Sequence, residues 1–162
     1  MMRRLIGIGL AGFLLLAVLS RVYPFGDKAL HGLAGASFSL LASAALSPLL
    51  LSEMHGCDAL ELALAVSASG LGAALAAGMA KELLDLGGFG RPEWLDLAAT
   101  VAGGLVASAG VLAMTYLAAS QGSGVERLPQ AYAPFGVVLA IPVSEALIRR
   151  LFGRPNSVST RF

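Results

Sequence analysis

Residues 59–85, ALELALAVSASGLGAALAAGMAKELLD, decide the fold class of this chain. Between Glu61 and Lys81 they form an uninterrupted run of apolar and small residues without a single charge. A helix needs about 20 such residues to cross the hydrocarbon layer of a bilayer. The run also lacks the strict alternation that is typical of a membrane barrel strand. This stretch therefore predicts a membrane-spanning α-helix.

Further segments of similar length and composition flank the first on both sides, over residues 5–22, 29–51, 94–119 and 131–148. The last of these is the weakest. Pro134, Pro142 and Glu145 interrupt it, which predicts a kinked or only partly inserted helix. The sequence as a whole predicts an all-α fold, a polytopic transmembrane bundle of four to five helices. We expect a single domain over residues 1–153 and a disordered tail over residues 154–162.

The composition supports a membrane protein and excludes several other classes. Of the 162 residues, 57% are hydrophobic and only 13% are charged, about half the charged share of a typical soluble domain. The net charge of +1 provides no basic face, so we expect no nucleic-acid partner. Cys57 is the only cysteine, which excludes an internal disulfide and a cysteine-based zinc site.

The segment over residues 5–22 has two interpretations. Arg3 and Arg4 precede its apolar core, as in a secretory signal peptide, and Val18 and Ser20 would form an acceptable cleavage site. The same pattern suits an uncleaved first membrane helix, and this is the interpretation that we favour.

Small residues recur four positions apart along the middle segments. These pairs are Gly32 and Ala36, Gly72 and Ala76, Ala74 and Gly78, and Gly103 and Ala107. That spacing places both residues on one helix face, where small side chains let two backbones approach closely. We expect tight packing within one monomer, and a dedicated dimer face is the alternative.

Charged residues gather at one side of the predicted bundle. Because successive spans alternate in direction, the start of the second, the end of the third and the start of the fourth share one membrane face. Charges within membrane helices are costly and usually mark function. The candidate catalytic or binding residues at this face are Asp27, Lys28, His31, Lys81, Glu82, Asp85 and Asp96.

Spacing within each helix supports a single polar pocket. Asp27 and His31 are four residues apart, so they share one helix face, and the same holds for Lys81 and Asp85. An ordinary interpretation stands beside this one, because charged residues at helix ends also act as caps, interfacial anchors and partners of the helix dipole. Glu93 suits a helix N-terminus in this way, and it is left outside the candidate set.

Three motifs within about residues 25–110 resemble those of a known family. Asp27-Lys28-x-x-His31 opens one membrane segment, GMAKELLD at 78–85 closes the next, and DLAAT at 96–100 leads to Gly103. In order and spacing they resemble the VanZ-like superfamily, and most of all its branch of small YfiM-like envelope proteins. The resemblance implies an integral protein of the bacterial inner membrane, in some members tied to low-level glycopeptide tolerance. It does not decide whether the chain is an enzyme.

Two positions depart from the family pattern. Thr100 stands where an amide is expected, which weakens one polar group of the site. Lys81, Glu82 and Asp85 stand in place of the glutamate and arginine motif of the VanZ type. The last segment and the tail lie outside the resemblance.

The first functional hypothesis is a polar site that binds or processes an envelope lipid or a lipid-linked precursor. His31, Asp85 or Asp96 would serve as acid or base. Lys28 and Lys81 would hold a phosphate. Membrane lipids are therefore the expected partners, and no cofactor is indicated.

Other hypotheses remain open beside the first. The chain is alternatively a small structural or accessory subunit of a larger membrane protein complex, with other membrane proteins as partners. A metal held by His31, Glu82, Asp85 and Asp96 has no recognised ligand spacing to support it. A proton or ion path is disfavoured because the middle of the bundle contains no charge.

The positive-inside rule allows two orientations. If all five segments span the membrane, the distribution of lysine and arginine places the charged site in the cytoplasm. If the last segment is re-entrant, the C-terminal arginines join Arg3, Arg4 and Arg127 inside, and the site faces out. The second scheme agrees better with the basic N-terminus, and it is the one that we expect.

Overall fold

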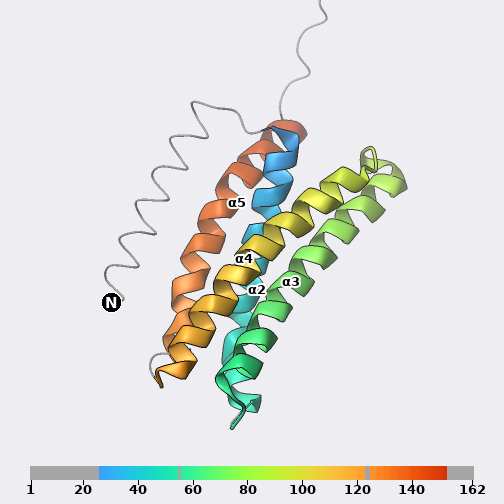
Figure 1. Ribbon diagram of the computed structural model, residues 1–162. Coiled ribbons are helices and arrows are strands. Elements are labelled where there is room, and N and C mark those ends of the chain that lie inside the picture. The colour runs from blue at the N-terminus through green and yellow to red at the C-terminus, as the bar shows by residue number, and fades with distance from the viewer. Residues whose placement is uncertain (1–25, 55, 123–124, 153–162) are drawn as a thin grey trace, which may run out of the picture.

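The computed structural model describes residues 26–54, 56–122 and 125–152, and it folds them into a bundle of four long helices (Figure 1). They are α2 (Asp27–Glu53), α3 (Ala59–Leu84), α4 (Trp94–Ser120) and α5 (Leu128–Phe152). A π-helical turn, η1 (Asp85–Phe89), follows α3, and a 3-10 turn, η2 (Val125–Arg127), precedes α5. The described residues contain no strand, which confirms the all-α fold.

All four helices are long and apolar enough to cross a membrane. Their lengths lie between 25 and 27 residues, more than the roughly 20 that a bilayer requires. The predicted segment over residues 5–22 and the predicted tail over residues 154–162 lie outside the described residues.

Helix α5 is continuous from Leu128 to Phe152 through Pro134 and Pro142, and the predicted kink or partial insertion stays a prediction. Figure 1 shows it running beside α2, with its C-terminal end beside the start of α2. A re-entrant segment would return to the face that it entered, so this continuous helix, long and apolar enough to cross a membrane, favours a full crossing over the re-entrant scheme. Proline is tolerated within membrane helices where neighbouring helices and local adjustments satisfy the freed backbone groups.

Helix ends follow local sequence signals. Asp58 caps α3, because its carboxylate accepts hydrogen bonds from the backbone amides of Leu60 and Glu61, both at 2.8 Å. The Glu61 carboxylate in turn accepts one from the Asp58 amide, which completes a capping box. At the other end of α3 the chain reverses through Gly88, whose φ of 98° favours glycine.

Helix α2 is the centre of the bundle, since it packs against α3, α4 and α5. Most buried residues are small or bear a hydroxyl group, with Val66 and Val111 as the larger buried apolar side chains. Other large apolar side chains, such as Phe38 and Val106, point outward. This distribution is the reverse of that in a soluble protein, and it suits helices surrounded by lipid.

The four-residue pairs of small residues divide between the inside and the outside of the bundle. Gly103 faces Gly32 so closely that a Cβ on Gly103 would overlap the Gly32 carbonyl. Ala74 and Gly78 are buried in the same way. Gly72, by contrast, is exposed, and a Cβ built on it meets no atom within 4 Å. Most of the pairs therefore pack one monomer, as expected, and one pair faces outward.

Candidate functional site

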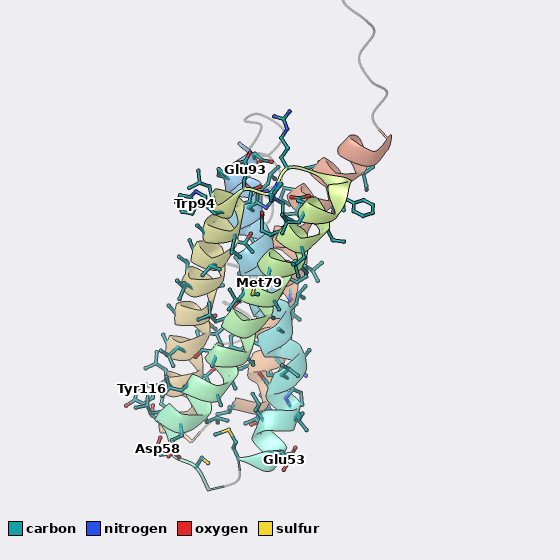
Figure 2. The ribbon with its side chains drawn as sticks, turned by 90° about the vertical axis from the view of Figure 1, so that its right-hand side faces the viewer. Glu53, Asp58, Met79, Glu93, Trp94 and Tyr116 are labelled. Atoms are coloured by element: carbon teal, nitrogen blue, oxygen red, sulfur yellow. The ribbon has the colours of Figure 1, made fainter. Side chains whose placement is uncertain are left out.

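The charged residues predicted from the sequence meet at one end of the bundle. Figure 2 shows Glu93 and Trp94 at this end, and Glu53, Asp58 and Tyr116 at the other. Trp94 and Tyr116 are exposed and mark the two ends of the apolar region, as aromatic residues do at membrane surfaces. We call the charged group the Asp96 cluster; it consists of Asp27, Lys28, His31, Lys81, Glu82, Asp85, Glu93 and Asp96.

Asp96 is the centre of this cluster. It lies in the first turn of α4, and its side chain is only 6% exposed. One carboxylate oxygen, Oδ1, accepts from Lys28 of α2, and the other, Oδ2, accepts from Lys81 of α3 at 2.5 Å. His31 Nε2 lies 3.3 Å from the same Oδ2. One carboxylate therefore joins three helices.

Lys81 connects Asp96 to the end of α3. Its ammonium group lies 2.8 Å from Asp85 Oδ2, one helical turn further on, and 2.9 Å from Glu82 Oε1. The side chains of Glu82 and Asp85 are largely buried. Glu82 also accepts a hydrogen bond from the backbone amide of Glu93 at 2.8 Å, which ties the start of α4 to the end of α3.

Glu93 is the member of the cluster that the sequence reasoning left out. Its carboxylate lies 2.5 Å from the Lys28 ammonium group, although the two residues are 65 positions apart. A signal was present, because Glu93 precedes Asp96 by three residues and both stand at the predicted start of a helix. Because Glu93 was interpreted as an ordinary helix-end residue, its contact with Lys28 was not predicted.

Asp27 and His31 form the exposed edge of the cluster. His31 Nε2 lies 3.8 Å from Asp27 Oδ2, as their four-residue spacing predicts. Asp27 does not cap its helix, because Gly26 holds that position and no side chain bonds there. The Asp27 side chain is 54% exposed, and the Lys28 ammonium group lies 3.9 Å from its Oδ2. Asp27 is thus the least satisfied carboxylate of the cluster.

The cluster carries more negative than positive charge. Five carboxylates face two ammonium groups, which leaves a net charge of −3 when His31 is neutral. An ion network that only held helices together would gain from balanced charge, because unpaired charges near a membrane are costly. Among the side chains that the structure describes, the cluster therefore has an excess of negative charge.

Thr100 stands one turn below Asp96 and closes the cluster on its membrane side. It is buried, and its hydroxyl donates to the backbone carbonyl of Asp96 at 2.9 Å. The amide expected here from the family resemblance could have reached further. Gly35 packs directly against the Thr100 backbone, so a larger residue on α2 would not fit at this point.

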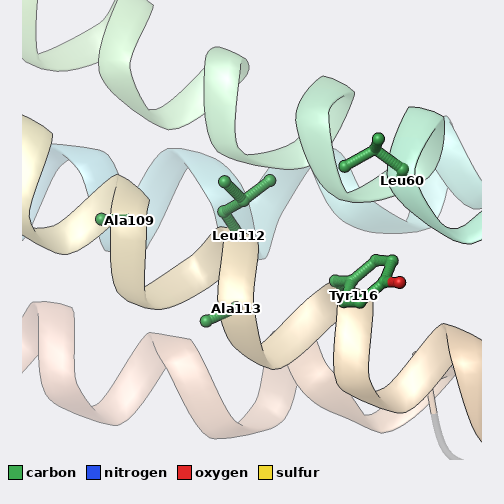
Figure 3. Close-up of a pocket in the computed structure, with 5 residues that line it drawn as sticks. All are labelled: Leu60, Ala109, Leu112, Ala113 and Tyr116. Atoms are coloured by element: carbon green, nitrogen blue, oxygen red, sulfur yellow. The ribbon is translucent and has the colours of Figure 1, made fainter.

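A second feature, drawn close up in Figure 3, includes Tyr116, which Figure 2 places at the opposite end of the bundle. It is an open depression of about 350 Å³ between α3 and α4, lined by Leu60, Ala109, Leu112, Ala113 and Tyr116. Its walls are apolar apart from the Tyr116 hydroxyl, and no residue of the Asp96 cluster lines it. It does not belong to the polar site.

No protein-family model, curated protein or solved structure matches this chain. The resemblance to the VanZ-like superfamily therefore stays a prediction from the motifs.

Replacing Asp96 tests whether the cluster holds the three helices together. In Asp96→Asn the Lys28 and Lys81 ammonium groups lose their shared partner, and we expect the free energy of unfolding to fall by about 2 kcal/mol. This is less than the roughly 3–5 kcal/mol for a fully buried pair, because both lysines keep other carboxylates and stay partly solvated. Unfolding by sodium dodecyl sulfate in mixed micelles measures the change.

Asp27→Asn is the control, since it removes one charge from the exposed edge of the same cluster. We expect it to change the free energy of unfolding by less than about 0.5 kcal/mol. Equal losses in the two variants would show that Asp96 has no special role.

Proposed function

We propose that this chain is a VanZ-like protein of the bacterial inner membrane that binds the headgroup of an envelope lipid or lipid-linked precursor at the Asp96 cluster. The observation that supports the proposal is the layering of the charges. Asp96 is buried, whereas the side chains of Asp27, Lys28 and Glu93 are 54%, 43% and 52% exposed at the end of the bundle. That end lies where lipid headgroups would lie beside the four candidate spans.

The charge imbalance narrows the class of headgroup. Lys28 carries the more exposed ammonium group of the cluster and would contact a phosphate. A headgroup with only negative charge would be repelled by the surplus carboxylates. A headgroup that also carries an amine, such as phosphoethanolamine, would place that amine against Asp27 or Glu93. We therefore infer a zwitterionic, amine-bearing headgroup.

The distribution of basic residues supports a cytoplasmic position for the cluster. Because α5 is a single helix, its basic C-terminus lies beside the start of α2, at the same end of the bundle as Lys28, Lys81 and Arg91. Arg127, which precedes α5, lies at the opposite end. Cytoplasmic ends carry the excess of lysine and arginine. We therefore infer that the loop between α2 and α3, with Cys57, faces the periplasm.

Labelling of Cys57 tests this orientation. Desolvation, and after it the nearby Glu61 carboxylate, raises the pKa of the Cys57 thiol, so less reactive thiolate is present at neutral pH. In intact bacteria we expect a membrane-impermeant maleimide to label Cys57, faster as the pH rises towards 9. Cys57→Ser gives the background. Labelling that requires broken cells would place the loop, and not the cluster, in the cytoplasm.

Lipid selectivity tests the proposed ligand. For the purified chain, native mass spectrometry should show retention of phosphatidylethanolamine at least about tenfold stronger than retention of phosphatidylglycerol, a difference of about 1.4 kcal/mol. Glu93→Gln should reduce that preference, because it removes one exposed carboxylate. The control Glu53→Gln, an exposed acid at the opposite end, should not. Equal retention of the two lipids would contradict the proposal.

A specific observation also favours a second function, that of an accessory subunit in a larger membrane complex. On the outer face of α3, small residues follow one another every four positions, and all are exposed: Ala68, Gly72, Ala76 and Ala80. Small residues at this spacing let another membrane helix approach closely. Within the part of the chain that the structure describes, no residue covers this row.

Gly72→Leu tests the second function. A Cβ at this position meets no atom of the described residues within 4 Å, so we expect the fold to survive and association with a partner to be lost. In native electrophoresis of membranes in mild detergent, the wild-type chain should then migrate as a large complex and the Gly72→Leu variant as a monomer. Gly103→Leu is the contrasting variant, because it collides with Gly32 and should unfold the bundle. A wild-type chain that is already monomeric would count against this function.

A further inference from the structure

Three side chains of the Asp96 cluster have the geometry of metal ligands. His31 Nε2 lies 3.3 Å from Asp96 Oδ2 and 3.8 Å from Asp27 Oδ2, and the three donor atoms all lie within 4.8 Å of one another. A tetrahedral ion with bonds of about 2.0–2.1 Å keeps neighbouring ligand atoms about 3.3–3.4 Å apart. The separation of 3.3 Å between His31 and Asp96 already matches a coordination sphere, whereas Asp27, 3.8 Å from His31 and within 4.8 Å of Asp96, would have to move closer to both.

From this geometry we propose that Asp27, His31 and Asp96 bind one divalent cation of the zinc class. One imidazole nitrogen and two carboxylate oxygens form a donor set that such ions accept. Asp27 and His31 are one turn apart on α2, and Asp96 comes from the start of α4. The ion would join these two helices at the membrane face.

The electrostatics of the cluster favour a cation at this point. Among the described side chains, the cluster has a net charge of −3 when His31 is neutral, and a divalent ion would reduce it to −1. Asp27, the least satisfied carboxylate, is one of the three ligands and would gain the strong cationic partner that it lacks.

The two lysines leave room for the ion. Lys28 contacts Asp96 through the other oxygen, Oδ1, and retains Glu93 as a second partner. Lys81 contacts Asp96 Oδ2, the same oxygen that would bind the ion, so it would lose this contact when the ion binds. It would keep Asp85 at 2.8 Å and Glu82 at 2.9 Å, so its charge would remain paired.

Three protein ligands leave at least one coordination position unused. Structural zinc sites are closed by four protein ligands, whereas sites that bind a further molecule keep one position for it. The proposed site belongs to the second kind. The inference stands on the three donor atoms and does not rest on lipid binding.

Metal titration of the full chain tests the proposal. We would use a His55→Ala, Cys57→Ser background, which removes the other histidine and the only cysteine, both potential ligands in the loop after α2. The protein is stripped with EDTA in detergent and titrated with Zn²⁺ by calorimetry and with Co²⁺ by visible absorption. We expect one ion for each chain and the Co²⁺ bands of a four-coordinate site.

Single replacements then assign the ligands. In His31→Gln and in Asp27→Asn we expect affinity to fall at least about tenfold, the loss that even outer partners of metal ligands cause. Asp58→Asn, at the opposite end, should leave affinity unchanged. No saturable binding below about 1 mM, or full binding in His31→Gln, would overturn the proposal. Because no lipid is added, failure here leaves the lipid result unaffected.

Discussion

The Asp96 carboxylate is the interaction on which the charged end of the bundle depends. It stands on α4 and receives Lys28 from α2 and Lys81 from α3, so the relative position of three helices is set at one side chain. A carboxylate that is 6% exposed cannot remain ionised without such partners. Gly35 packs directly against the Thr100 backbone, which allows α2 and α4 to approach closely just below the cluster.

Below the cluster, the helices are held together by close backbone contact and by interhelical hydrogen bonds. Apolar side chains gain little by leaving lipid, so close backbone contact and interhelical hydrogen bonds must hold the helices together. Ser39 and Ser108 share a hydrogen bond of 2.8 Å between α2 and α4, and Thr115 and Tyr132 share one of 2.8 Å between α4 and α5. Ser37 donates to the Gly136 carbonyl at 2.7 Å, which attaches α5 to α2.

The sequence predicted the spans and the meeting of the charges because both depend on simple quantities, the length of apolar runs and the alternation of direction. It could not predict the pairing of Glu93 with Lys28, because a residue at a helix start has local roles that explain it equally well. It could not show that α5 continues as one helix, because Pro134 and Pro142 are a strong local signal against helix, whereas in the structure α5 runs through both and packs against α2. The serine-lined interior was missed because hydroxyl groups leave no apolar periodicity.

The two ends of the bundle use acidic residues in opposite ways. At the opposite end of the bundle, the Asp58 and Glu61 carboxylates accept hydrogen bonds from backbone amides in the capping box of α3. This local role accounts for both acidic residues. At the Asp96 end no such account suffices, since Asp27 caps nothing and the carboxylates outnumber the lysines. Both the amine of a lipid headgroup and a divalent ion would relieve that excess. An amine bound at Asp27 would compete with the ion for this carboxylate, whereas an amine bound at Glu93 would leave the three ion ligands in place.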